Sequence, residues 1–393
     1  PDGTILQEEM DEDGKKVWKP FSKLGVRRAI LNDLSPAATF IAYNYNTPVD
    51  VAAFQSQAKK ILKEVKEECG WMYETLHTDG KTKGRINYVV WSDVFVCSEC
   101  AEEFVFWDVA VKIGEGIVLD DFHCPNCNHW LSKSPANPKT ENSKPTSHRR
   151  PISSKVERAW ETFFDDAIGE TIKQAKKSPV LINYSVGKLR TEKTPDANDL
   201  RLIEKIETAP FSHWFPCDRM MAGKETRRND PIGLTHIHHF YTKRNLLILS
   251  ALRAKVEESG IKALHYWLNS LDHGLGKRVK HGNYSFPMST LSGTLYVPSL
   301  GRENNPLYFY ATRFKKQSAV LAGSSAQGNP VSTQSSERLN VLDNSLDYIF
   351  VDPPFGSNLN YSELSFPWEC WMKVRTDNVP EAIENSVQGK GSA

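Results

Sequence analysis

The stretch from Asp347 to Gly356 constrains the fold of this chain more than any other. Tyr348 to Val351 is a short run of aromatic and β-branched residues, which predicts a buried strand. Asp352-Pro353-Pro354-Phe355 follows directly, and Gly356 lets the chain turn. Because neither proline has an N–H to donate, strand pairing must stop there. The sequence therefore places a carboxylate, two rigid prolines and an aromatic ring at the carboxyl end of a strand, where open α/β sheets bind ligands.

These side chains suit one reaction, the transfer of a methyl group to the exocyclic amine of a nucleobase. Such an amine is a weak nucleophile because its lone pair is delocalised into the ring. The Asp352 carboxylate and the Pro353 carbonyl can accept its two N–H groups and turn the lone pair toward an electrophilic methyl, while Phe355 offers a stacking face. A base inside a duplex must flip out to reach them. The alternative is a strand that ends in a Pro-Pro turn, with Asp352 as a turn former.

Segment 341–364 resembles the catalytic motif of S-adenosylmethionine-dependent amino-methyltransferases, in particular the DNA adenine-N6 methyltransferases. Family members that act on cytosine N4 more often carry serine at the position of Asp352, so the aspartate favours adenine. The resemblance implies that Asp352, Pro353, Pro354 and Phe355 are the catalytic residues. It also implies an α/β fold with a doubly wound, Rossmann-like methyltransferase sheet.

A second resemblance lies in residues 26–42. Val26 to Leu31 predicts a strand, and Ser35 and Pro36 predict the N-cap and first residue of a helix. The segment RRAILNDLSPAATFIA resembles the second strand and acidic loop of these methyltransferases. The resemblance implies that Asp33 binds the cofactor ribose and that Leu34 lies near its adenine. It further implies that a polar segment carrying Ser335 approaches the cofactor.

The family's Gly-rich loop, of the type Phe-x-Gly-x-Gly, wraps the methionine part of the cofactor. It does not occur between Pro1 and Arg27. Either this loop precedes the chain or the chain binds the cofactor poorly, and we expect the former. The methyltransferase sheet within these residues is accordingly expected to be incomplete.

Two CxxC pairs give the strongest metal signal in the chain, at Cys97 and Cys100 and at Cys124 and Cys127. Strand-like residues separate the pairs, which is the spacing of a zinc ribbon. Four thiolates complete a tetrahedron and leave no open position, so we predict a structural zinc. The alternative is four reduced, buried cysteines.

Composition limits the remaining choices. The net charge is +1, so a nucleic-acid partner must be recognised by local patches rather than by a general basic field. No apolar run has the length of a membrane span, and Pro1-Asp-Gly-Thr shows no secretory pattern. Seven cysteines, four of them in CxxC pairs, favour a reducing compartment. We therefore predict a cytoplasmic protein with no membrane partner.

Four regions follow from these signals. Residues 1–70 hold the cofactor side of the methyltransferase core, 71–135 an inserted zinc ribbon, and 136–235 a linker and candidate target-recognition region. Residues 236–393 hold helices and the catalytic half of the core.

Local patterns predict a loop over residues 1–20, helices over 50–70 and 242–258, and helical segments over 159–164 and 172–175. They also predict a strand over 180–186. The loop 218–230, with four basic residues, is the candidate phosphate contact. His236, His238 and His239 resemble metal ligands, but no carboxylate lies near them in the sequence. We therefore assign these histidines to packing or phosphate contact.

The expected function is methyl transfer from S-adenosylmethionine to the N6 amine of a flipped adenine in DNA. The expected partners are DNA and a restriction or defence-system protein. Two alternatives stay open: an RNA amino-methyltransferase that acts on guanine N2 or adenine N6, and a non-catalytic zinc-ribbon protein that binds nucleic acid.

Overall fold

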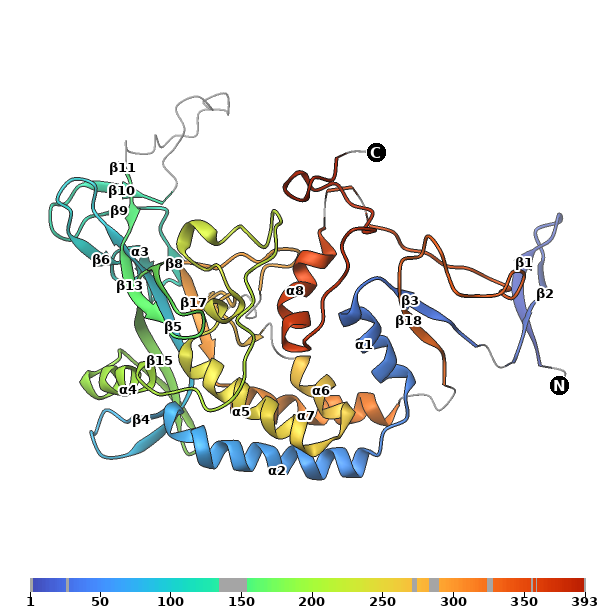
Figure 1. Ribbon diagram of the computed structural model, residues 1–393, viewed down its shortest axis with the longest axis horizontal. Helices are drawn as coiled ribbons and strands as arrows, with labels where there is room; N and C mark the ends of the chain where they lie inside the picture. Colours follow the sequence, from blue (N-terminus) through green and yellow to red (C-terminus); the bar gives the residue numbers. More distant parts are fainter. Residues whose placement is uncertain are drawn as a thin grey trace.

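The computed structural model describes residues 3–25, 28–133, 154–270, 274–282, 290–323, 328–354, 356–357 and 359–391. Its largest sheet has seven strands and is built around the long strand β5 (Lys83–Val96). β15 (Lys177–Val186) and β17 (Leu300–Asn304) both pair with residues 88–92 of β5, and so lie on its two edges (Figure 1). Four shorter strands complete the sheet: β4 (Glu74–Leu76), β6 (Glu103–Val105), β12 (Glu157–Arg158) and β16 (Leu189–Lys193). Every pairing in this sheet is antiparallel.

The middle of β5 is buried on both faces, which explains its apolar run from Tyr88 to Trp91. Ile86 and Val89 belong to a core shared with the helices, whereas Tyr88 and Val90 belong to a core shared with the cysteine-rich segment. The helices of the first core run along one side of the molecule in Figure 1: α2 (Val51–Cys69), α5 (Lys243–Ser259), α6 (Lys262–Asn269) and α7 (Pro306–Ala322). The cysteine-rich segment thus packs directly on the central strand.

The helix boundaries follow from their caps, and the predicted helices over 50–70 and 242–258 are confirmed. Asp50 accepts a hydrogen bond from the Ala53 N–H at 2.9 Å and begins α2. Thr242 accepts from the Asn245 N–H at 3.3 Å and begins α5, which ends at Gly260 in the left-handed conformation. The remaining helices are α1 (Pro36–Asn46), α3 (Phe106–Ala110), α4 (Ala197–Glu207) and α8 (Tyr361–Trp371).

Two segments differ from the sequence prediction. The expected loop at the N-terminus is a hairpin of β1 (Thr4–Met10) and β2 (Lys16–Lys23). The segments expected to be helical form a second hairpin, β13 (Trp160–Asp165) and β14 (Glu170–Ala175). Their aromatic and β-branched residues favour strands, and Gly169 supplies the positive φ that the turn needs. The predicted strand over 180–186 is confirmed as part of β15.

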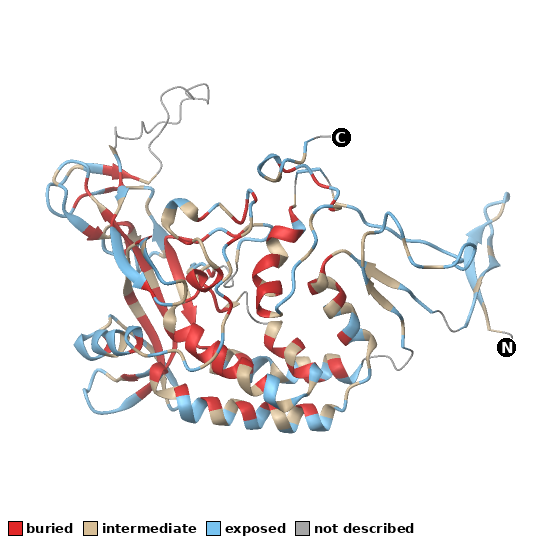
Figure 2. Ribbon diagram, in the orientation of Figure 1, coloured by how far each residue is buried: buried red, intermediate tan, exposed pale blue. Residues whose placement is uncertain are grey.

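Parallel pairing is found between β3 (Leu31–Asp33) and β18 (Val331–Thr333), which form a two-stranded sheet. The predicted strand over 26–31 is wrong in its start, because β3 begins only at Leu31; Val26 and Arg27 lie outside the described residues. The chain is therefore mixed α/β, with an antiparallel main sheet and a small parallel pair beside α1. Figure 2 shows the main sheet and its helices as the buried part, and the β1–β2 hairpin as largely exposed.

Short strands complete the cysteine-rich segment: β7 (Val111–Lys112), β8 (Ile117–Val118), β9 (Asp121–His123), β10 (Trp130–Ser132) and β11 (Ser154–Lys155). Residues 134–153, which include the start of the predicted linker and recognition region, lie outside the described residues.

Candidate functional site

The four predicted zinc ligands come together at the end of β5 and after β9. The sulfur atoms of Cys97 and Cys127 lie 3.6 Å apart, and those of Cys100 and Cys124 lie 3.7 Å apart. Four thiolates around one tetrahedral zinc would be separated by about 3.8 Å, whereas a disulfide would bring two sulfurs to about 2 Å. All four sulfur atoms lie within 4.8 Å of one another. The cluster therefore has the geometry of a structural zinc site with four cysteine ligands.

Each CxxC pair is shaped as a tight turn by the backbone that follows it. The Ala101 N–H donates to the Cys97 carbonyl at 3.0 Å, and the Asn128 N–H donates to the Cys124 carbonyl at 3.0 Å. Both donors have positive φ, of 58° and 60°.

A backbone N–H from Glu102 lowers the pKa of the Cys100 thiol to about 6. The His129 N–H acts to lower the pKa of Cys127, but desolvation and hydrogen bonds with the other three thiols outweigh it and raise this pKa to about 12. The metal-free thiols thus share protons that a bound metal would displace.

The predicted cofactor residues lie at the carboxyl ends of β3 and β18. The Gln334 N–H donates to the Asp33 carbonyl at 3.1 Å, so Ser335 follows directly beside the end of β3. Asp33 is exposed, and its carboxylate accepts the Ser35 N–H at 2.8 Å, as an aspartate does before a helix. Ser35 in turn is the N-cap of α1. Leu34 and Ser335 are half-buried beside Asp33.

The predicted catalytic strand does not form. Tyr348 and Val351 are 80% and 68% exposed, and no strand is assigned across them. A strand requires a neighbouring ladder, and the described residues before Val26 form a separate antiparallel hairpin instead of a third parallel strand. Asp352 and Pro353 are exposed and Pro354 is half-buried. Phe355 lies outside the described residues.

A buried carboxylate ties the segment after this motif to the candidate phosphate-contacting loop. Glu363 of α8 is fully buried and accepts the backbone N–H groups of Lys224, Glu225 and Thr226 at 3.1, 2.7 and 2.8 Å. Gly223 makes room for it, because a Cβ there would lie 2.2 Å from the Glu363 carboxyl carbon. The loop 223–226 is therefore fixed to α8 by backbone hydrogen bonds.

The arginines of this loop are paired internally. Arg219 and Arg227 approach Asp230 at 2.8 and 3.3 Å, and Arg228 approaches Glu225 at 2.5 Å. These ion pairs reduce the positive charge that the loop offers to a phosphate backbone.

Asp165 supplies the carboxylate that the sequence reading did not find near His238 and His239. The Nε2 atoms of both histidines lie 2.8 Å from Asp165 Oδ2, and all three side chains are buried. Asp165 comes from β13, 73 residues before His238, so proximity in sequence gives no sign of it.

The hydrogen bonds of His239 identify its protonated nitrogen. Its Nδ1 accepts backbone N–H groups from Thr235 at 3.1 Å and from His236 at 3.3 Å, so in the neutral ring the proton lies on Nε2. That nitrogen donates to Asp165 and has no lone pair for a metal. Burial lowers the pKa of His239 to about 3. Burial acts to raise the pKa of Asp165, but hydrogen bonds from His239 and His238 outweigh it, so this pKa is lowered. The group is thus an ionised carboxylate held by two neutral imidazoles.

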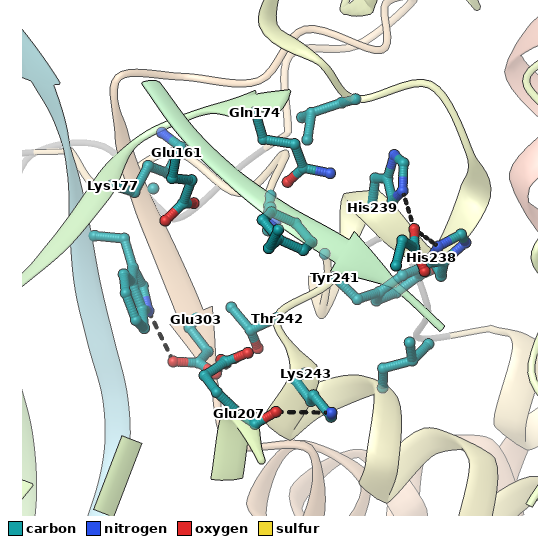
Figure 3. Close-up of a pocket in the computed structure, with 18 of the residues that line it drawn as sticks. Glu161, Gln174, Lys177, Glu207, His238, His239, Tyr241, Thr242, Lys243 and Glu303 are labelled. Carbon is teal, nitrogen blue, oxygen red and sulfur yellow. Dashed lines mark hydrogen bonds and ion pairs between the residues drawn. The ribbon is translucent and has the colours of Figure 1, made fainter. Parts of the chain in front are cut away.

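Next to this group lies a cavity of about 630 Å³ (Figure 3). The β13–β14 hairpin covers one side, β15 and β17 form a wall, and the end of α4 and the start of α5 close the opposite side. Lys277 enters from the loop before β17, and Glu161, Glu207 and Glu303 enter from other elements. Sequence reasoning missed this cavity, because its lining comes from segments that are far apart in the chain and because the hairpin was predicted as helix.

Comparison with protein-family models, with curated proteins and with solved structures gives no match for this chain. Within its described part, none of the helices is both long enough and apolar enough to cross a bilayer.

Proposed function

We propose that the protein is an S-adenosylmethionine-dependent methyltransferase that acts on the N6 amine of adenine in DNA. The observation that supports this most directly is the parallel pairing of β3 with β18. It joins two segments about 300 residues apart, and it sets Asp33 and Ser335 at neighbouring strand ends. Ligands of open α/β sheets bind at such ends.

The proposed roles follow from chemistry and position. Asp33, being exposed at the end of β3, offers its carboxylate to the ribose hydroxyls of the cofactor, and Leu34 and Ser335 contact the same ligand. Asp352 accepts one N–H of the target amine and the Pro353 carbonyl accepts the other, while Pro354 stiffens the turn and Phe355 stacks on the base. The four-cysteine site stabilises the segment that packs on β5.

Methyl transfer can be measured with tritiated S-adenosylmethionine and unmethylated duplex DNA. The native chain is expected to label adenine N6, and Asp352→Asn is expected to reduce the rate by roughly a hundredfold or more. Asp343→Asn, an exposed aspartate in the same segment, is the matched control and should retain the native rate. Equal labelling by Asp352→Asn and native protein, or label on structured RNA but not on DNA, contradicts the proposal.

A second candidate, a non-catalytic zinc-ribbon protein that binds nucleic acid, has one observation in its favour. Tyr348 to Val351 is exposed and unpaired within the described residues, which is unusual beside a working active site. This candidate predicts that native protein binds DNA without transferring methyl groups. Loss of transfer with intact DNA binding in Asp352→Asn would exclude it.

A further inference from the structure

The cavity under the β13–β14 hairpin contains three charged side chains, a lysine and two glutamates that attract it electrostatically, which form no hydrogen bond or ion pair with the described residues. Glu161 and Glu207 lie on opposite sides of the space in Figure 3, and Lys277 also lines it. In the described part of the chain, none of these three side chains forms an ion pair or a hydrogen bond. Other charges of the lining are already paired, as Lys177 is with Asp93 and Glu303 is with Arg244. The unpaired groups are therefore available to a ligand.

The environment of these groups disfavours their charged forms. Glu161 and Glu207 keep solvent-exposed surface, yet desolvation by the protein around their carboxyl groups raises their pKa values. Burial, and then the charge of Lys177, lower the pKa of Lys277 to about 8. A ligand that donates hydrogen bonds to the two glutamates and accepts one from the lysine would stabilise the charged forms of all three side chains.

Part of the lining is aromatic. Trp91 and Tyr241 form part of the wall, and Trp91 is held in place by a 2.8 Å hydrogen bond from its Nε1 to Glu303. Phe163 lines the cavity on the same face of β13 as Glu161 and Asp165, and it is 41% exposed. Exposed aromatic rings are typical stacking platforms for unpaired bases.

The other face of the same hairpin carries positive charge. Lys173 of β14 lies 4.8 Å from the ring centroid of Trp160 on β13. A lysine over an exposed aromatic ring offers both a phosphate contact and a stacking face. These features belong to the region that the sequence assigned to target recognition.

We propose that this cavity holds one unpaired nucleobase that carries an exocyclic amine, presented by a single-stranded segment of nucleic acid. The amine donates to Glu161 or Glu207, a ring nitrogen or carbonyl accepts from Lys277, and the ring lies among Trp91, Tyr241 and Phe163. This inference rests on the proposed function for its choice of nucleic acid as ligand. Thymine presents a carbonyl where adenine and cytosine present an amine, so the glutamates reject it.

Calorimetry with single deoxynucleotides on the full chain tests this inference without S-adenosylmethionine. dAMP and dCMP are expected to bind at least about tenfold more tightly than dTMP, which carries the same phosphate. A single-stranded oligodeoxyadenylate should displace dAMP, and its duplex with oligothymidylate should not. Equal binding of dAMP and dTMP, or no displacement by the single strand, overturns the inference.

Substitutions of cavity residues test whether dAMP binds in this cavity. Glu207→Gln and Lys277→Met are expected to weaken dAMP binding by about tenfold or more. Glu204→Gln, an exposed residue of the same helix, is the matched control and should bind dAMP as the native chain does. Phe163→Ala, in the cavity lining, should weaken oligonucleotide binding, and Phe21→Ala, at an exposed phenylalanine of β2, should not. Native affinity in both cavity variants overturns the inference.

A measurement on the native chain avoids any folding defect of the variants. Acetylation of Lys277, followed by mass spectrometry, should slow by about tenfold at saturating dAMP and should stay unchanged with dTMP at the same concentration. Lack of protection by dAMP overturns the inference. Protection of Lys277 by dAMP should persist in Asp352→Asn, in which methyl transfer is expected to be lost, so the two proposals fail independently of each other.

Discussion

At the residue scale, Glu363 shows how one buried carboxylate fixes a loop. It accepts three backbone N–H groups, and the amide of Asn385 also donates to it at 2.5 Å. Glu363→Gln places an N–H2 group against these donors, so we expect the free energy of unfolding to fall by about 3 kcal/mol. Chemical denaturation measures this loss. Glu384→Gln, at an exposed glutamate, should change stability by less than about 0.5 kcal/mol, and a similar loss in both variants would contradict the account.

Because Asp165 is hydrogen-bonded to two buried histidines, His238 and His239, we expect the stability of the chain to depend on pH. His239 stays neutral in the folded chain down to about pH 3, whereas in the unfolded chain it gains a proton near pH 6.5. The unfolded state therefore binds more protons between these values, and stability falls as pH falls through that window. The pKa of His238 is lowered in the same direction, mainly by burial.

His239→Gln removes the imidazole that takes up one of these protons in the unfolded chain. Between pH 4 and 6 the slope of unfolding free energy against pH should decrease by about 1.4 kcal/mol per pH unit. Urea denaturation across this range measures the slope, and His213→Gln, at a half-buried histidine outside the group, is the control. An unchanged slope in His239→Gln would show that His239 is charged in the folded chain.

Sequence reasoning succeeds at the residue scale where the partner is local. The caps Ser35, Asp50 and Thr242 each bond to a backbone N–H three residues later, and the predicted cysteine spacing is confirmed by the clustered sulfurs. It fails where the partner is distant, as with Asp165, which meets His238 and His239 only after the hairpin folds over them.

At the element scale, the cysteine-rich segment and the central strand share one core. Phe95 of β5 packs with Phe104 and Phe106, so loss of zinc should destabilise the main sheet as well. Cys100→Ser is expected to remove the bound zinc and lower the unfolding temperature by about 10 °C. Metal analysis and calorimetry measure both effects. Cys217→Ser, at an exposed free cysteine, should change neither, and full zinc content in Cys100→Ser would contradict the assignment.

The β13–β14 hairpin depends on one close approach. Gly233 has φ of 79°, and a Cβ there would lie 2.1 Å from the Lys173 carbonyl oxygen. Gly233→Ala should destabilise the chain by about 2 kcal/mol or more and speed amide exchange in both strands of the hairpin. Gly187→Ala shares the positive φ but meets nothing within 4 Å, so it should cost only the backbone strain of about 1 kcal/mol. Equal losses would show that the close approach does not matter.

Elements with strong local signals were predictable, and those set by pairing were not. α2 and α5 carry their own caps and apolar stripes, and their sequences suffice. Tyr348 to Val351 has the composition of a strand, yet it is exposed because no parallel neighbour pairs with it in the described chain. Strand composition alone therefore does not fix the state of a segment.

At the scale of the whole molecule, most of the buried structure belongs to the antiparallel sheet around β5 and to its helices. The features that resemble a methyltransferase lie apart from that sheet, on β3, β18 and the segment that ends at Pro354 (Figure 1). The sequence motifs pointed to these segments, because the residues of each motif follow one another closely in the chain. The sheet around β5 and its helices are assembled by contacts between distant segments of the chain. The two CxxC pairs were the motif that the sequence offered for them.

The central claim is that the ends of β3 and β18 bind S-adenosylmethionine, and calorimetry with this cofactor tests it most directly. The account predicts binding by the native chain, a loss of affinity of about tenfold or more in Asp33→Ala, and none in the control Asp13→Ala, at an exposed aspartate between β1 and β2. No binding by the native chain, or equal binding by Asp33→Ala, would contradict the account and favour the non-catalytic, nucleic-acid-binding alternative.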